Sequence, residues 1–435
     1  MLQSSHRLTV AMMPNLSHLA INGGAKAVKQ ALPPMYPGGM RVGAEEEEAV
    51  IEVIRSKRLF RYYGPNPGKS KTDELETAFS ARIGARHALA VSSGSAALVC
   101  ALIALGAGPG DEVIVPAYTW IASASAVLAA GAVPILAEVD ESLTLDPADV
   151  ARKITRHTRV IMAVHMRGAP CNMDGLSALA RQHGIKLLED VAQAAGASYR
   201  GAHLGSIGHA GAFSFQYNKI ITCGEGGMVT TNDFELFRRT AMYHDVIGGI
   251  RNGVPPAKIL PGVNLRMSEL QAAVALVQFR RLDSLLAEMR QHNHALKASM
   301  ADVSRRKGIT FRKQNDAEGD TDICLVFYLP QPATAQRVVA ALAAEGLPAT
   351  VLHRPGYGDY HVYCNWLPIV DKRTWSVNGG PWRWHEGPVE YPRDQCPRTL
   401  DLLSRAVHID ISPDLTRENI EEMAAALNKV LDALA

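Results

Sequence analysis

Short apolar runs alternate with amphipathic segments between residues 70 and 235. The runs have the length of strands and are nearly continuous in hydrophobicity, which is typical of strands covered on both faces. The segments between them repeat their apolar positions every three or four residues, as a helix with one buried face does. We therefore predict strands at 87–91, 112–115, 133–137, 160–164 and 186–190, and helices at 72–83, 95–105, 120–130 and 173–183. This alternation predicts an α/β fold with a parallel, doubly wound sheet.

The second half of the chain shows a weaker form of the same alternation. A strongly helical stretch at 268–300 has the length of a connector that leaves the first region. A strand at 323–329, a helix at 333–345 and a last helix at 417–434 predict a smaller α/β unit. We expect three parts, namely a loosely ordered N-terminal arm (1–35), a large domain (36–285) and a small C-terminal domain (286–435).

Residues 353–397 form a segment of a different kind, rich in glycine, proline, histidine and aromatic residues. All but one of the tryptophans of the chain lie in it. A loop of this length is usually functional or disordered, and so many aromatic residues argue against disorder. Two interpretations stay open at this point. The segment lines a substrate pocket, or it packs the small domain or a dimer.

Charge and cysteine usage narrow the classes of partner. With 45 Lys plus Arg against 43 Asp plus Glu, the net charge of +2 argues against a large polyanion-binding surface, and we expect no nucleic-acid partner. The six cysteines are scattered with no pair at CxxC spacing, which predicts reduced thiols in a cytoplasmic protein and no metal site. The apolar stretch at 8–13 is too short for a signal peptide, and no run approaches the ~20 apolar residues of a membrane helix.

The first chemical signal is a run of small residues at 92–97, between a predicted strand and a predicted helix. Small residues such as Gly94, Ser95 and Ala96 let the backbone approach a ligand closely. The free N–H groups and the positive dipole at a helix start suit a phosphate. The alternative is an ordinary serine that caps the helix.

The second signal is Asp190, at the C-terminal end of a predicted strand. Ligands bind at this edge of a parallel sheet. A buried carboxylate there requires a cationic partner, and the protonated nitrogen of a pyridine ring would supply one. The charge on that nitrogen is what makes pyridoxal 5'-phosphate (PLP) an electron sink. The alternative is an aspartate that caps a helix.

The third and fourth signals are a lysine and a tryptophan. Lys219 lies between the apolar residues Phe213 and Phe215 and a glycine turn at 224–227. A lysine held against apolar surface is desolvated, and desolvation favours the neutral amine that attacks an aldehyde. Trp120 directly follows a predicted strand, where its ring can stack on a flat cofactor. Read singly, the lysine could be solvated and the tryptophan could belong to the core.

These signals occur in an order that is more specific than any one of them. A phosphate loop, an aromatic residue, a strand-end aspartate and a lysine before a glycine turn resemble the aspartate-aminotransferase-like fold, PLP fold type I. More closely, the chain resembles the DegT/StrS-type sugar and aminocyclitol aminotransferases. The resemblance is dense over 40–300 and rests on the motifs at 92–97, 108–113, 116–120, 189–193, 213–219, 224–227 and 264–271. It implies a mostly parallel sheet of seven strands between helices, with a smaller C-terminal α/β domain.

The resemblance also implies roles for the matching residues. Lys219 would carry PLP as a Schiff base and move the proton between substrate and cofactor, while Asp190 would pair with the ring nitrogen. Trp120 would stack on the ring, and Gln193 would lie near its hydroxyl. The phosphate would be bound by Gly94, Ser95, Ala96 and Ser214.

Two further positions bear on assembly and reaction type. Asn264 would reach the phosphate of the neighbouring subunit, so the resemblance implies a homodimer with shared active sites. Leu265 departs from a common tyrosine of the same motif, which we interpret as tuning. Some relatives are sugar dehydratases with a histidine in place of the lysine. The presence of Lys219 therefore favours transamination.

The resemblance extends loosely to substrates. The segment 353–397, with its motifs at 361–363, 372–374 and 396–398, is similar to glutamine-dependent aminotransferases of inosose-type cyclitol ketones. The implied donor is L-glutamine or L-glutamate, and the implied acceptor is a scyllo-inosose-like keto-cyclitol or a keto-sugar. Arg167 is a candidate carboxylate or substrate contact, with a structural arginine as the alternative. Competing hypotheses are a nucleotide-sugar aminotransferase, a PLP-dependent dehydratase or cyclase, and a non-catalytic protein that keeps the fold.

Overall fold

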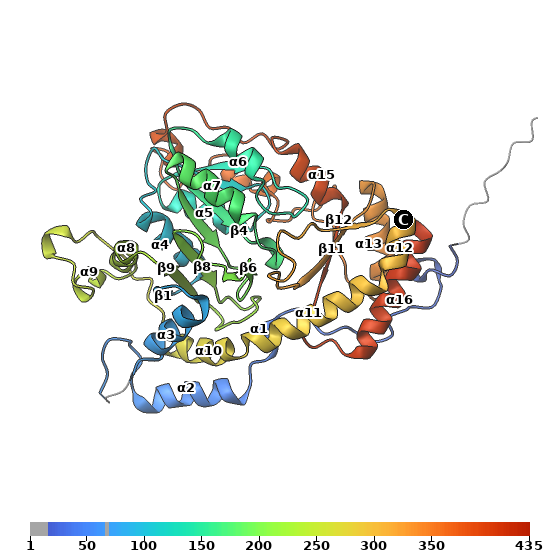
Figure 1. The fold of residues 1–435 in the computed structure, drawn as a ribbon, viewed down its shortest axis with the longest axis horizontal. Helices are drawn as coiled ribbons and strands as arrows, with labels where there is room; N and C mark the ends of the chain where they lie inside the picture. The colour runs from blue at the N-terminus through green and yellow to red at the C-terminus, as the bar shows by residue number, and fades with distance from the viewer. Residues whose placement is uncertain (1–15, 66–68) are drawn as a thin grey trace, which may run out of the picture.

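A seven-stranded sheet organises the larger part of the molecule (Figure 1). The computed structural model describes residues 16–65 and 69–435. The strand order is β1-β9-β8-β5-β4-β2-β3, and β9 alone runs antiparallel to its neighbours. The predicted fold class, with a mostly parallel sheet, is confirmed. The strands are β1 (His87–Val91), β2 (Glu112–Pro116), β3 (Val133–Ala137), β4 (Thr158–Val164), β5 (Lys186–Asp190), β8 (Ala210–Ser214) and β9 (Gly227–Thr231).

The helices around this sheet are α2 (Ala44–Ser56), α3 (Lys71–Ile83), α4 (Gly94–Ala104), α5 (Ala122–Ala129), α6 (Pro147–Lys153), α7 (Met173–His183) and α8 (Phe234–His244). Four of them, α3, α4, α5 and α7, begin and end within two residues of the predicted positions, whereas α2, α6 and α8 were not predicted. α4 packs across β8 and β9, and α7 packs on β4 and β5. We predicted a helix that begins at Trp120, but α5 begins at Ala122. Trp120 therefore lies on the loop after β2 and not inside a helix.

A second, antiparallel sheet is built from the C-terminal part of the chain. Its strands are β10 (Thr310–Phe311), β11 (Cys324–Tyr328) and β12 (Ala406–Asp410), in that order. The helices beside it are α13 (Pro332–Ala344), α15 (Pro397–Arg405) and α16 (Arg417–Leu434). The connector predicted as one helix is two, α10 (Glu269–Arg280) and α11 (Leu282–Ser299), which meet at Arg281. The Arg281 guanidinium is bound there by Glu45 and Glu46 of α2.

The described part of the N-terminal segment is packed, contrary to the loose arm that we expected. Leu19 and Val28 are buried. The buried carboxylate of Glu345 accepts hydrogen bonds from the backbone N–H groups of Ala20 (2.8 Å) and Ala27 (2.9 Å), and it pairs with Lys429 of α16. Residues 16–35 are therefore fastened to α13 and α16, while the remainder of the expected arm, 1–15, lies outside the described residues.

The aromatic segment 353–397 follows the outer edge of the main sheet. Near its start, the carbonyl of His361 accepts a hydrogen bond from the N–H of Thr119, just after β2 (3.0 Å). Near its end, the Tyr391 hydroxyl donates to the carbonyl of Pro134 on β3 (2.9 Å). β3 is the last strand of the sheet, so the segment covers an edge that would otherwise be open to pairing. Its first part also reaches the C-terminal end of β2.

Three further observations concern the part of the chain that the structure describes. No helix within 16–65 and 69–435 is both long and apolar enough to cross a membrane. Over the same ranges, no three His, Cys, Asp or Glu side chains gather as ligands of a metal would. All six cysteines are free thiols, and all but Cys223 are buried.

The Glu345 cluster gives a test of the N-terminal packing. Glu345→Gln should lower the free energy of unfolding by about 2 kcal/mol, because an amide cannot accept from Ala20 and Ala27 while facing the Lys429 ammonium. These bonds outweigh burial and hold the pKa of Glu345 below its usual 4.5. The stabilisation should therefore be present at neutral pH and be lost as the pH falls through that lowered value.

Urea unfolding of both proteins at pH 7 and at acidic pH measures this effect. The exposed Glu418→Gln on α16 is the matched control and should change stability little. A Glu345→Gln protein as stable as the parent at pH 7 would show that the segment does not depend on this carboxylate.

Candidate active site

The loop between β1 and α4 presents free backbone N–H groups. The Ser93 hydroxyl accepts a hydrogen bond from the N–H of Ala96 (3.1 Å), so Ser93 caps α4. No described residue accepts a hydrogen bond from the N–H of Gly94 or Ser95. A Cβ on Gly94 would lie 2.6 Å from the Cβ of Ser214, so glycine lets the end of β8 approach this closely. The loop and Ser214 thus converge at a helix N-terminus, which favours an anion.

Asp190 is buried at the C-terminal end of β5. Its carboxylate accepts hydrogen bonds from the Ser123 hydroxyl (2.8 Å) and from the N–H of Ala192 (3.1 Å), and neither donor is a cation. Burial raises the pKa of Asp190, and those two bonds together with the attraction of Lys219 offset the effect only in part. A carboxylate desolvated to this degree is stabilised when a cation binds beside it.

Lys219 lies in a turn after β8. Its N–H donates to the carbonyl of Gln216 (2.9 Å), and its carbonyl accepts from the N–H of Gly38 (3.3 Å). Burial lowers the pKa of Lys219, Asp190 raises it and Arg167 lowers it further, with a net downward shift. The amine is therefore neutral at a lower pH than an ordinary lysine, which makes it a better nucleophile at neutral pH.

Trp120 and Gln193 both lie beside His361, which the sequence analysis had placed only within the aromatic segment. The ring of His361 lies 5.0 Å from the exposed Trp120 ring, at 54° to it. The Gln193 amide nitrogen is 3.5 Å from Nε2 of His361, and the amide oxygen accepts a hydrogen bond from the N–H of Arg167 (3.1 Å). His361 therefore joins the candidate site. The only sequence signal for it was its membership of the motif at 361–363.

Within one chain, the Asn264 side chain does not contact the other candidate site residues. It is exposed, and its side-chain oxygen accepts a hydrogen bond from the N–H of Arg266 (3.3 Å). The next residue, Leu265, does reach the phosphate loop, because its carbonyl accepts a hydrogen bond from the N–H of Ser92 (2.8 Å). The expected contact of Asn264 with a neighbouring subunit stays a prediction.

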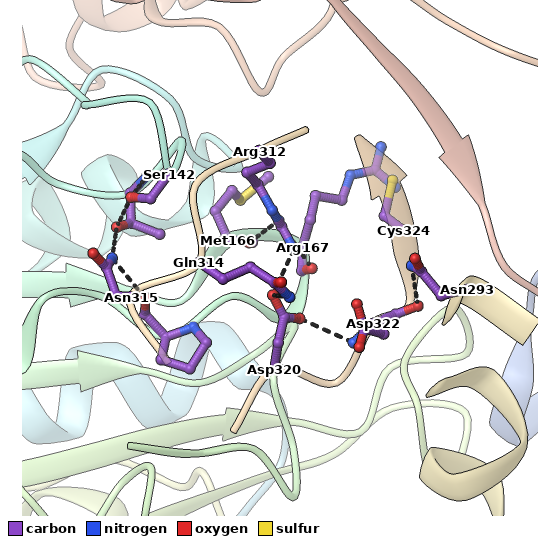
Figure 2. Close-up of polar contacts among 12 residues, drawn as sticks. Ser142, Met166, Arg167, Asn293, Arg312, Gln314, Asn315, Asp320, Asp322 and Cys324 are labelled. Carbon is purple, nitrogen blue, oxygen red and sulfur yellow. Dashed lines mark hydrogen bonds and ion pairs between the residues drawn. The ribbon is translucent and has the colours of Figure 1, made fainter. Parts of the chain in front are cut away.

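Arg167 follows β4 in a conformation that a side chain rarely adopts. Its backbone is left-handed, with φ 51° and ψ 39°, and its guanidinium pairs with Asp410 of β12 (2.6 Å). Arg312 fastens the same turn from the second sheet, because it donates to the carbonyl of Met166 (3.3 Å) and pairs with Asp320 (2.8 Å) (Figure 2). Strain of this kind persists only where the surroundings impose it, and it is common at functional sites.

The residues present fit PLP. An anion site, a buried carboxylate without a bound cation, an exposed indole and a desolvated lysine follow the C-terminal ends of β1, β5, β2 and β8, which is one edge of the sheet. PLP carries a phosphate, a basic ring nitrogen, a flat ring and an aldehyde, which match these four features one to one.

Comparisons with known proteins agree with this assignment. A model of the DegT/DnrJ/EryC1/StrS aminotransferase family matches residues 41–366. The L-glutamine:2-deoxy-scyllo-inosose aminotransferase of Streptoalloteichus tenebrarius is 35% identical over 433 residues, 95% of this chain and 97% of that protein. GDP-perosamine synthase of Caulobacter vibrioides is 44% identical over 219 residues, 49% of this chain and 57% of that protein.

A solved structure shares the whole architecture. The aminotransferase from Psychrobacter cryohalolentis superposes with a TM-score of 0.78 at 28% identity and covers 93% of this chain and 100% of that one. The matched range, 41–366, includes Asp190 and Lys219. The chain therefore belongs to the DegT/DnrJ/EryC1/StrS aminotransferase family and is a PLP-dependent aminotransferase.

Proposed function

We propose that this enzyme transfers the amino group of L-glutamine to a keto-cyclitol of the scyllo-inosose type, as a step in aminocyclitol biosynthesis. The observation that carries the proposal is similarity to an L-glutamine:2-deoxy-scyllo-inosose aminotransferase over 97% of that protein's length. A nucleotide-linked keto-sugar is the second candidate, supported by the higher identity to GDP-perosamine synthase over a shorter span, 219 residues. L-Glutamate is the alternative donor for either acceptor.

The residues of this chain divide the work of transamination between them. When bound, PLP supplies an aldehyde and an electron-accepting ring. The N–H groups of Gly94 and Ser95, with the Ser214 hydroxyl, would hold its phosphate. Asp190 would favour a proton on the ring nitrogen, because a buried carboxylate stabilises a neighbouring cation. Lys219 holds or releases a proton at Nζ, for which its lowered pKa suits it.

We assign the α-carboxylate of the amino donor to Arg167. Its guanidinium is mostly buried, and Asp410 takes only Nη1, while Nε has no partner among the described residues. Arg167 also lies near enough to Lys219 to lower the pKa of that amine. A donor amino acid must present its amine to Lys219 and carries a carboxylate beside it. An arginine whose guanidinium is not fully engaged suits that carboxylate.

A cavity beside this ion pair has room for the donor side chain. It has a volume of about 380 Å³ and lies between the N-terminal segment and β12. Both ring nitrogens of His408, a buried residue on its wall, have no partner among the described residues. Unsatisfied polar groups of this kind favour a polar ligand such as a carboxamide. The other polar lining residues are Tyr36, Thr350, Asp410 and Ser412.

We propose that the active form is a homodimer. The segment around α9 (Gly248–Arg251) projects from the body of the molecule beyond α8 (Figure 1). It exposes large apolar side chains, which are Val246, Ile247, Ile250, Leu260 and Val263. Apolar surface of this extent on a projecting segment is typical of a subunit interface. Asn264 follows the same segment, so this dimer is consistent with its expected reach into the neighbouring site.

The donor half-reaction tests the proposed function. L-Glutamine added to the PLP form should convert it to the pyridoxamine form, which is seen as loss of the visible cofactor absorbance. Lys219→Ala should abolish the change, and the exposed Lys26→Ala should leave it intact. Mass spectrometry of keto-cyclitols and nucleotide-linked keto-sugars incubated with the pyridoxamine form then identifies the acceptor class. A wild-type enzyme that responds to no amino donor would overturn transamination.

A second prediction tests the carboxylate site at Arg167. Arg167→Met should slow the half-reaction with L-glutamine by about 10- to 100-fold, the range expected for a charge-assisted contact. The rate with 4-aminobutanamide, which is glutamine without its α-carboxylate, should change by less than about 3-fold because that contact is absent. Arg305→Met, at an exposed arginine, is the control. Equal losses with both donors would contradict the assignment.

A third prediction concerns the pH dependence of the Lys219 amine in the apoenzyme. Asp190 raises the pKa of Lys219, so Asp190→Asn should move the midpoint of its reaction with a small aldehyde to lower pH. Arg167 lowers that pKa, so Arg167→Met should move the midpoint to higher pH. Borohydride trapping followed by peptide mass spectrometry reads the reaction, with Lys26 as the internal reference. Shifts in the opposite directions would contradict the electrostatic account.

A further inference from the structure

The aromatic segment brings a carboxylate and an imidazole to Gln193. Nδ1 of His361 lies 2.7 Å from a carboxylate oxygen of Asp359, and the backbone N–H of His361 donates to the same oxygen (2.7 Å). Nε2 of the same ring faces the Gln193 amide nitrogen at 3.5 Å. Both Asp359 and His361 are largely buried. The three side chains therefore form a continuous line from the segment to the candidate cofactor site.

The donors and acceptors along this line are determined by its two ends. Burial raises the pKa of Asp359, but the hydrogen bonds from His361 outweigh it and hold the pKa below its usual 3.8. Asp359 is therefore an acceptor, and Nδ1 of His361 carries the proton. In the neutral imidazole, Nε2 is then an acceptor that faces Gln193. At the other end, the backbone N–H of Arg167 can only donate, so the oxygen of the Gln193 amide accepts it.

This leaves the Gln193 amide with one orientation and one unused hydrogen. Its oxygen faces the Arg167 N–H, and one hydrogen of its NH₂ group is directed to Nε2 of His361. No described residue accepts the second hydrogen. Because the oxygen is already engaged, Gln193 can offer a ligand a hydrogen bond as a donor. Without His361 as an acceptor, the amide would lose one of the two contacts that orient it.

We propose that Asp359 and His361 are positioning residues that fix Gln193 as a hydrogen-bond donor to the ring oxygen of the bound cofactor. This inference rests on the proposed function and on the place beside that oxygen which the family resemblance implies for Gln193. A donor stabilises the oxygen in its anionic form, and an amide in the opposite orientation would repel it. The catalytic groups remain Lys219 and Asp190, and the pair in the aromatic segment acts through Gln193.

The imidazole is not needed to hold the segment in place. Backbone groups do that, because the N–H of Thr119 donates to the carbonyl of His361 (3.0 Å) and the N–H of Ile121 donates to the carbonyl of Tyr360 (3.2 Å). These bonds survive substitution of the side chain. A variant at His361 should therefore keep the fold, and its effect on Gln193 can be measured separately.

The experiment compares two cofactor forms that differ only in the ring oxygen. Pyridoxamine 5'-phosphate binds the apoenzyme without a covalent bond, and its 3-deoxy analogue lacks the oxygen. His361→Phe should weaken binding of the first by about 3- to 10-fold, as expected for one hydrogen bond, and leave binding of the analogue unchanged. His361→Gln, which restores an acceptor, should recover part of the loss. Asp359→Ala should give a smaller loss in the same direction, because the ring can then change tautomer.

Fluorescence titration of the apoenzymes gives each dissociation constant without turnover. His385→Phe, at a histidine on the far part of the same segment, is the matched control and should bind both forms like the parent. Equal weakening of both forms by His361→Phe, or a parent that does not discriminate between them, would overturn the inference. Failure of the parent to bind either form would instead contradict the proposed function.

Discussion

A carboxylate buried without a cation is the constraint on which the candidate site depends. Moving Asp190 out of water costs free energy that the Ser123 hydroxyl and the Ala192 N–H recover only in part. A cation that binds against it would recover the remainder, and in the proposed site that cation is a protonated ring nitrogen. The same burial lowers the pKa of Lys219 and keeps it reactive. One desolvated edge of the sheet would therefore prepare both the proposed cofactor contact and the proposed nucleophile.

Local sequence predicted the strands that are continuous apolar runs, and it missed strands that owe their position to packing. β1, β3 and β5 were predicted to the residue because each is short, has an apolar centre and follows a helical segment. β8 contains Ala210-Gly-Ala, which is weak in β-propensity. A Cβ on Gly211 would lie 2.5 Å from the Cα of Gly205, so these small residues serve the close passage of another segment. No pattern along the strand itself records that contact.

The candidate site likewise contains residues that the sequence predicted and residues that it missed. Gly94, Asp190 and Lys219 each lie in a short motif with a local chemical meaning, so the sequence could single them out. His361 reaches Gln193 across 168 positions, and its partner Asp359 lies in a segment without regular structure. The packing of residues 16–35 on Glu345 is equally remote in sequence. Contacts made between distant segments leave no periodicity along the chain, and the motif at 361–363 did not show what His361 contacts.

The Gln193 amide links the parts of the site that came from different regions. Its oxygen holds the N–H of Arg167, which helps to explain how an arginine remains in a left-handed conformation that costs about 1 kcal/mol or more. Its nitrogen faces His361 of the aromatic segment. Because Arg167 and His361 both orient the Gln193 amide, this amide connects the proposed contact with the donor carboxylate to the proposed contact with the cofactor. The amino donor and the keto acceptor must use the same lysine in turn. The proposed site would distinguish these two substrates by their charge. In the proposed assignment the donor carries a carboxylate for Arg167, whereas a keto-cyclitol has none and must be recognised by its hydroxyl and carbonyl groups.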